Sequence, residues 1–207
     1  MIRLLTLLSI AIAVHSLRIR QCTCAEIKPC TKVNSTTVMK CTDQCQKHAN
    51  KTGASFLPLR KCFEDIDGSI DGIIKCFKNK LVNTCAPHDN PLMVRKFHPD
   101  ALKLALLKEI TDQLKKSGIR NEIMKFFRED KLFSICRLKC MTDESLRCFR
   151  TRRCGLSLPS NHEIVKSLKD CALVNGMDTD GFRKLCHCTA NAGARGLAES
   201  CDKIVIS

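Results

Sequence analysis

The segment HPDALKLALLKEITDQLKKSG, residues 98–118, carries the clearest secondary-structure signal in the chain. Proline suits the first position of a helix and glycine its C-terminal cap, so Pro99 and Gly118 predict where this helix begins and ends. Lys115 and Lys116 in the last turn suit the helix dipole. Between these ends an apolar residue recurs at every fourth position, at Leu102, Leu106, Ile110 and Leu114. The spacing predicts a helix with one apolar face.

Other segments also favour helices. Ser160 and Glu163 in SNHE have the form of a capping box, and an apolar face follows at Ile164, Val165, Leu168 and Cys171. Runs that alternate apolar and polar residues are few. We therefore expect an all-α, disulfide-rich fold.

The apolar face of residues 99–117, with IRNEIMKFFRED after it, has two readings. A basic amphipathic helix can lie in a membrane interface. Acidic residues interrupt the positive face here, namely Glu109, Asp112, Glu122, Glu129 and Asp130. We expect the face to pack on a core instead. A saposin-like domain is not indicated, because the paired cysteines such domains carry near their start are absent.

The first sixteen residues have the pattern of a secretory signal peptide. Arg3 supplies a positive charge, an apolar run follows over residues 4–14, and cleavage is expected after Ser16. The run is too short to span a membrane, and no later stretch is apolar enough to do so. We therefore expect a secreted, extracellular protein without a transmembrane segment.

All 16 cysteines follow this signal, and an even number in an oxidising compartment predicts disulfides without a free thiol. Crosslinks would compensate for a small aromatic core, since the chain has nine Phe and neither Trp nor Tyr. The expected disulfide residues are Cys22, Cys24, Cys30, Cys41, Cys45, Cys62, Cys76, Cys85, Cys136, Cys140, Cys148, Cys154, Cys171, Cys186, Cys188 and Cys201.

These cysteines fall into two groups of eight, and residues 86–135 between the groups contain none. We expect a signal peptide at 1–16, an N-terminal cysteine-rich helical unit at 17–86, a cysteine-free helical linker at 87–135 and a C-terminal unit at 136–207. Some spacings recur: Cys41 and Cys45 are four apart, as are Cys136 and Cys140. An internal duplication explains this, and so does chance matching in a cysteine-rich chain.

Cysteines four apart lie on one helix face and are expected to bond to other helices. The contiguous Cys186, His187 and Cys188 could instead suggest zinc. Behind a signal peptide we expect disulfides and no metal site. Cys186 and Cys188 would point roughly 200° apart on a helix and so bridge to different elements.

The chain has a formal net charge of +14. The densest basic segment, RLKCMTDESLRCFRTRRC, predicts a surface that attracts polyanions. In a secreted protein these are glycosaminoglycans, anionic lipids or acidic proteins, and nucleic acid is not an expected partner. A solvated basic face is the alternative. The candidate residues are Arg137, Lys139, Arg147, Arg150, Arg152 and Arg153.

Enzyme motifs are missing. The position four after His162 is Lys166, so the zinc-protease pattern is incomplete, and neither a nucleophile elbow nor a phosphate-binding glycine loop occurs. We expect no catalytic residue and no cofactor. Asn34 and Asn50 begin N-glycosylation sequons.

The segments CRLKC, RRCGLSLPSNHEIVKSLKDC and LCHCTANAGARGLAESCDKIVIS lie within residues 136–207. This part of the chain resembles the secreted nematode domain named after chondroitin proteoglycan 4. The resemblance implies an extracellular, matrix-associated protein. Members of this family that carry chondroitin do so on Ser-Gly sites, usually beside acidic residues. Ser117-Gly118 is the one Ser-Gly pair here, and its surroundings are basic, so the resemblance suits a protein that binds chondroitin chains better than one that carries them.

Two functions therefore remain open. The first is a structural or matrix-interaction protein that binds polyanions such as glycosaminoglycans. The second is a soluble basic effector, either a signalling ligand or a membrane-active defence protein. The sequence does not give the oligomeric state.

Overall fold

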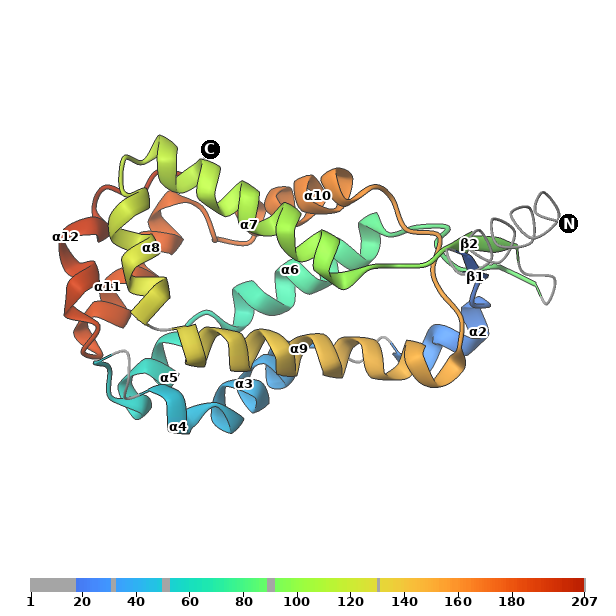
Figure 1. The fold of residues 1–207 in the computed structure, drawn as a ribbon, viewed down its shortest axis with the longest axis horizontal. Coiled ribbons are helices and arrows are strands. Elements are labelled where there is room, and N and C mark those ends of the chain that lie inside the picture. The colour runs from blue at the N-terminus through green and yellow to red at the C-terminus, as the bar shows by residue number, and fades with distance from the viewer. Residues whose placement is uncertain (1–17, 31–32, 50–52, 89–91, 130, 207) are drawn as a thin grey trace, which may run out of the picture.

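The computed structural model describes residues 18–206 apart from 31–32, 50–52, 89–91 and 130. The expected signal peptide lies outside the described residues. The fold is all-α and disulfide-rich, with one two-stranded ribbon (Figure 1). The elements are β1 (Arg18–Arg20), α2 (Cys24–Ile27), η1 (Lys28–Cys30), α3 (Ser35–Gln44), α4 (Gln46–Ala49), α5 (Phe56–Glu64), α6 (Asp67–Lys80), β2 (Met93–Arg95), α7 (Pro99–Lys116), α8 (Arg120–Glu129), α9 (Lys131–Arg152), α10 (Asn161–Val174), α11 (Thr179–Asn191), η3 (Arg195–Leu197) and α12 (Ala198–Cys201).

Helix α7 begins and ends where its sequence predicts. Pro99 occupies the first turn, and Gly118 follows the helix with φ +70°. The amide of Gly118 donates to the carbonyl of Lys115, and that of Ile119 donates to the carbonyl of Leu114. These two bonds form a Schellman motif, which satisfies carbonyls that the helix end leaves without a partner. Ile119 is only 1% exposed, so the motif also holds a side chain of the main apolar core in place.

The capping box of α10 is confirmed. The amide of Glu163 donates to the Ser160 hydroxyl over 3.3 Å, and the Ser160 amide donates to the Glu163 carboxylate over 2.8 Å. These bonds satisfy two amides at the helix start, a contribution of about 1 kcal/mol. Ile164, Val165 and Cys171 on the predicted apolar face are buried.

The main apolar core lies at one end of the molecule, where α5, α8, α11 and α12 meet the start of α9 (Figure 1). Phe56, Leu59, Ile123 and Phe133 contribute its large side chains. Elsewhere disulfide-bonded cysteines, and not large apolar side chains, fill much of the buried interior. Among the largest fully buried side chains are six half-cystines, namely Cys22, Cys41, Cys45, Cys62, Cys171 and Cys201.

All sixteen cysteines pair, which confirms the expected eight disulfides. Four bridges form a nested series that fixes residues 22–45 antiparallel to residues 136–154. They are Cys22–Cys154, Cys30–Cys148, Cys41–Cys140 and Cys45–Cys136. The last two join α3 to α9 and confirm that cysteines four apart bond to another helix.

The division into two cysteine-rich units needs correction, because six of the eight bridges cross between the two groups. Only Cys24–Cys85 and Cys186–Cys201 lie within one group. The crossing bridges make the two groups parts of one covalently linked body. Residues 87–135 are not a linker either, since α7 packs on α10, α8 packs on η3, and α9 runs through the expected boundary at 136.

The two cysteine pairs with the same spacing, one at the end of α3 and one on α9, are bonded to each other. The first cysteine of the α3 pair bonds the second of the α9 pair, and the second bonds the first. Cys62–Cys188 joins α5 to α11, while Cys76–Cys171 joins α6 to α10. Reciprocal pairing of this kind is expected across a twofold axis. The internal duplication stays a prediction that this pattern favours.

Candidate polyanion interface

The six basic residues that the sequence singles out all lie on α9 or just after it, but they do not form one surface. Arg137 turns inward, with its guanidinium 3.9 Å from the ring centroid of Phe63 and 5.5 Å from that of Phe133. Such cation–π contacts contribute about 0.5–2 kcal/mol. Arg137 therefore supports the core, and the prediction that it contacts a polyanion is not favoured.

The middle of α9 carries balanced charges. Arg147 pairs with Glu144 over 3.0 Å, and Arg150 pairs with Asp143 over 3.1 Å. Lys40 of α3 also donates to Glu144 over 3.1 Å, and this hydrogen bond lowers the pKa of the Glu144 carboxyl. A polyanion at this surface would have to compete with these carboxylates.

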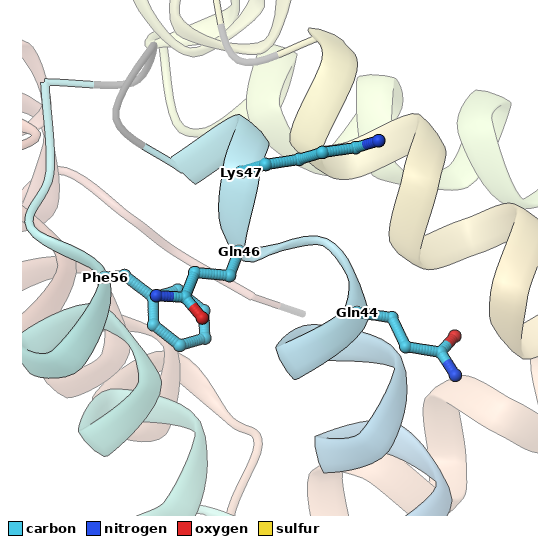
Figure 2. A pocket seen from close by; sticks show the side chains of 4 residues that line it. All are labelled: Gln44, Gln46, Lys47 and Phe56. Carbon is cyan, nitrogen blue, oxygen red and sulfur yellow. The ribbon is translucent and has the colours of Figure 1, made fainter.

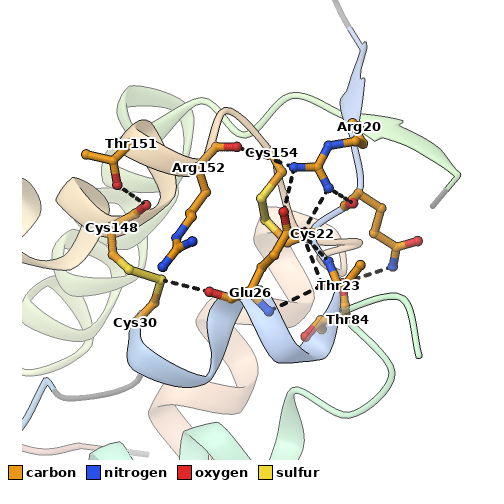
Figure 3. Close-up of a disulfide and its surroundings, with 11 residues drawn as sticks. Arg20, Cys22, Thr23, Glu26, Cys30, Thr84, Cys148, Thr151, Arg152 and Cys154 are labelled. Atoms are coloured by element: carbon orange, nitrogen blue, oxygen red, sulfur yellow. Dashed lines mark hydrogen bonds and ion pairs between the residues drawn. A yellow bond between two sulfur atoms is a disulfide. The ribbon is translucent and has the colours of Figure 1, made fainter. Parts of the chain in front are cut away.

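The end of α9 is different. Arg152 and Arg153 are exposed, and the structure gives neither guanidinium an acidic partner among the described residues. Cys154 follows them and is disulfide-bonded to Cys22 (Figure 3). The backbone of Gly155 reinforces this connection, because its amide donates to the carbonyl of Arg20 over 2.9 Å. The backbone segment that carries the two arginines is thus fixed beside β1.

Strands β1 and β2 form an antiparallel ribbon in which Arg18 faces Arg95 and Ile19 faces Val94. Successive side chains point to opposite faces of a strand. Ile19 and Val94 turn toward Gly155, where an added Cβ would lie 2.7 Å from Ile19 Cγ2. The opposite face of the ribbon therefore presents arginines.

The side chain of Arg20 is oriented by hydrogen bonds to a carboxylate. It donates to both carboxylate oxygens of Glu26, over 2.8 and 2.9 Å (Figure 3). Glu26 also accepts from the backbone amide of Thr23 over 2.8 Å and so completes the capping box of α2. The hydrogen bonds from Arg20 and then Thr23 lower the pKa of Glu26 to about 2. The ion pair orients Arg20 while Glu26 neutralises one positive charge.

We call the arginines of the ribbon and of the adjoining end of α9 the basic end: Arg18, Arg20, Arg95, Arg152 and Arg153. Arg18 and Arg95 are exposed and lack an acidic partner among the described residues. Side chains opposite each other on neighbouring strands have Cβ atoms about 4.5–5.5 Å apart, and like charges there repel. An anion placed between them would relieve that repulsion. Glu26 is the one carboxylate of the described residues that pairs with an arginine of the basic end.

Sequence reasoning found Arg152 and Arg153 but missed the three arginines of the ribbon. The alternation in Arg18-Ile19-Arg20 was a weak signal for a strand with one charged face, and three residues are too few to make it stand out. The remaining candidate, Lys139, lies elsewhere, beside a cavity between α7 and α9.

Asn34 is exposed and caps α3, with its side-chain oxygen accepting from the amide of Thr37 over 3.2 Å. Its side-chain nitrogen, to which a glycan would be attached, is not used in this cap. Glycosylation of Asn34 stays a prediction. Asn50 lies outside the described residues.

Cys186 and Cys188 bridge to different elements, as the helical period predicted. Cys186 bonds Cys201 of α12, Cys188 bonds Cys62 of α5, and the His187 Nε2 lies 2.8 Å from Asp202 Oδ1. Across the described part of the chain, no group of three or more histidine, cysteine or acidic side chains is arranged to hold a metal ion.

A shallow cavity of about 410 Å³ lies where α3, α4 and α5 meet (Figure 2). Its lining combines two amides, one ammonium group and one phenyl ring, from Gln44, Gln46, Lys47 and Phe56. Acid–base catalysis needs a titratable group of suitable pKa within reach of a substrate. These four side chains do not supply a pair of such groups, so the basic end remains the stronger candidate.

No protein-family profile matches this chain, and no curated protein or solved structure shows significant similarity to it. Within the residues described, no helix has the length and apolar character needed to cross a membrane.

Proposed function

We propose that this is a secreted, disulfide-stabilised matrix protein that binds acidic polysaccharides, of the glycosaminoglycan class, through its basic end. The observation that carries the proposal is the exposed, cross-strand pair of Arg18 and Arg95, in a ribbon that is hydrogen-bonded through Gly155 to the end of α9, where the exposed Arg152 and Arg153 lie. Guanidinium groups donate in a planar fork that matches sulfate and carboxylate oxygens. A linear polyanion could contact several of them at once.

Extracellular location supports this choice of partner. Eight disulfides suit an oxidising compartment, and the signal-peptide pattern of residues 1–16 predicts export to one. Cleavage after Ser16 would leave a new α-amino group one residue before Arg18 and add a positive charge near the ribbon. The proposed relationship to the chondroitin proteoglycan 4 domain fits the same setting, with this chain as a binder of such polysaccharides.

The disulfides support a scaffold role. Cys22–Cys154 and Cys30–Cys148 fasten the segment of β1 to the end of α9, and the β1–β2 ladder holds Arg95 of the third segment. A binding surface held in this way loses little conformational freedom when a ligand arrives. The surface is therefore suited to a static contact in a matrix.

The test is chromatography of the secreted protein on immobilised chondroitin sulfate and heparin at physiological salt. We expect retention that is lost as salt is raised, because screening weakens interactions between exposed charges. The double substitution Arg18→Gln and Arg95→Gln should elute at lower salt. Its control is Lys184→Gln with Lys203→Gln, which removes the same charge from the opposite end of the molecule (Figure 1).

Unretained wild-type protein would reject the proposed function. Equal shifts for the two double variants would mean that net charge, and not the basic end, causes retention.

A further inference from the structure

Five helices lie around the middle of the molecule, and we call the apolar surface that they expose between α7 and α9 the trough. Helix α6 packs against α3 on one side and α10 on the other, while α9 packs on α3 and α7 packs on α10. Helices α7 and α9 are not among the extensively packed pairs. Figure 1 looks between α7 and α9 onto α6.

The base of this trough is apolar. On α6, Gly72 lies against α10 and Cys76 is disulfide-bonded to it, whereas Asp71 accepts hydrogen bonds from α3. By the helical period, the sector between these two contacts faces the opening. That sector carries Ile70, Ile73, Ile74 and Phe77. All four are only partly buried, and no residue of α6 is fully buried.

The walls are apolar as well. On α7, Lys103, Leu107 and Ile110 follow one stripe, and the last two are 47% and 45% exposed. On α9, Ile135 and Leu138 are 46% and 41% exposed. Residues of both helices line a cavity of about 210 Å³, and they are Pro99, Asp100, Lys103, Ile135, Leu138, Lys139, Thr142 and Asp143.

Charges at the rim of this cavity favour an anionic ligand. Lys103 on α7 and Lys139 on α9 are exposed, and neither has an ion-pair partner among the described residues. Asp143 is paired with Arg150, so Asp100 is the one other carboxylate that lines the cavity among the residues the structure describes. Two ammonium groups against that carboxylate leave the rim positive.

We propose that the trough binds a single-chain anionic lipid, a long-chain fatty acid, with its alkyl chain between α7 and α9 and its carboxylate at Lys103 and Lys139. Transfer of an alkyl chain and of these leucine and isoleucine side chains out of water is favourable. Of these apolar residues, Ile135 and Leu138 line the cavity beside the two lysines. Leu107 and Ile110 continue the apolar surface along the stripe of Lys103, so one alkyl chain can lie along it. A bilayer contact needs an apolar face that projects from the surface.

The experiment titrates dansyl-undecanoic acid into the purified protein with its disulfides intact. We expect a saturable, blue-shifted rise in fluorescence that oleate reverses by competition. Absence of a saturable signal would overturn the proposal, as would a signal that oleate does not displace.

Variants locate the site. Leu107→Glu or Leu138→Glu places a negative charge in the trough and should weaken probe binding at least about tenfold, a change of about 1.4 kcal/mol. Leu57→Glu is the control, because Leu57 is 74% exposed on α5, away from the trough. All three positions are exposed, so folding should be retained, and circular dichroism with thermal unfolding checks this. An equal loss in Leu57→Glu would contradict the assignment.

A separate pair of variants tests where the carboxylate of the fatty acid binds, and this test does not depend on the glutamate variants. Lys103→Gln with Lys139→Gln should weaken binding of the probe about two- to twenty-fivefold, since each exposed ion pair contributes about 1.4-fold to fivefold. Lys184→Gln with Lys203→Gln should leave it unchanged. Equal affinities in both double variants would overturn the placement of the carboxylate.

A last experiment distinguishes binding of a free fatty acid from binding to a membrane surface. Vesicles of phosphatidylcholine with phosphatidylglycerol should not retain the protein in a flotation assay run at a salt concentration that releases it from heparin, because screening then removes the attraction of the basic end for the anionic headgroups. Binding to these vesicles without binding of dansyl-undecanoic acid would replace the proposal with a membrane-active effector.

Discussion

Arg18 and Arg95 lie directly opposite each other in the β1–β2 ribbon. Like charges in this position destabilise a strand pair, whereas opposite or neutral pairs stabilise it, by about 0.2–1 kcal/mol. A sequence optimised for stability alone would not place two arginines there. The pair is better explained if an anionic ligand bridges the two guanidinium groups.

Replacing one arginine of this pair should therefore separate stability from binding. Threonine suits a strand, so Arg95→Thr should raise the free energy of unfolding by about 0.2–1 kcal/mol and weaken polysaccharide binding. Thermal unfolding with and without heparin measures both effects. Heparin should raise the midpoint of the wild type more than that of the variant, because a ligand that binds the folded state stabilises it. An equal rise in both proteins would count against the pair as a contact.

Glu26 gives the basic end a pH dependence. Its pKa is lowered to about 2 in the folded protein, chiefly by hydrogen bonds from Arg20, whereas an unfolded glutamate titrates near about 4.3. A lowered pKa means that the ionised form stabilises the fold above the unfolded pKa, and that this contribution is lost as pH falls toward 2.

Glu26→Gln should therefore lower the thermal midpoint at pH 7, and the difference from the wild type should shrink between about pH 5 and pH 2. The control is Glu122→Gln, since Glu122 is exposed on α8 without an ion-pair partner among the described residues. A difference between wild type and Glu26→Gln that stays constant down to pH 2 would show that the Arg20 ion pair does not stabilise the fold.

Gly155 determines how closely the ribbon approaches the end of α9. A Cβ at this position would lie 2.7 Å from Ile19 Cγ2, which forces the side chain or the strand to move. Gly155→Ala should destabilise the protein by about 1–3 kcal/mol and weaken heparin binding. Gly68→Ala is the matched control, because nothing lies near its Cβ position on α6, and it should stabilise by about 0.4–1 kcal/mol. Urea unfolding distinguishes these outcomes.

The nested disulfides make the loss of the outermost bridge a local event. With Cys30–Cys148 intact, removal of Cys22–Cys154 opens a loop of only about 15 residues, so we expect a loss of about 3 kcal/mol. Cys22→Ala with Cys154→Ala should speed amide hydrogen exchange in β1 and β2 while α11 stays protected. Uniformly faster exchange would mean that the bridge holds the whole fold.

The local part of this fold is predictable from sequence. Pro99 and Gly118 mark the ends of α7 because the first turn and the Schellman motif depend on adjacent residues. The capping box at Ser160 is local in the same way. The compartment-based expectation of full cysteine pairing also holds.

The long-range part is not predictable from one sequence. Cysteine spacing suggested two units, since grouping along the chain says nothing about which residues pair across it. The antiparallel course of residues 22–45 along α9 arises only in three dimensions. For the same reason only part of the basic end was predicted. Arg152 and Arg153 were recognised because they lie in the densest basic segment, while Arg18 and Arg95 come from two short strands distant in sequence.

The most direct test of the central claim is arginine footprinting. The protein is treated with p-hydroxyphenylglyoxal with and without a heparin oligosaccharide, and modified peptides are quantified by mass spectrometry. We predict that the oligosaccharide protects Arg18, Arg95, Arg152 and Arg153 but leaves Arg183 and Arg195 at the opposite end as reactive as before. Protection confined to that opposite end, or equal at all arginines, would contradict polysaccharide binding at the basic end.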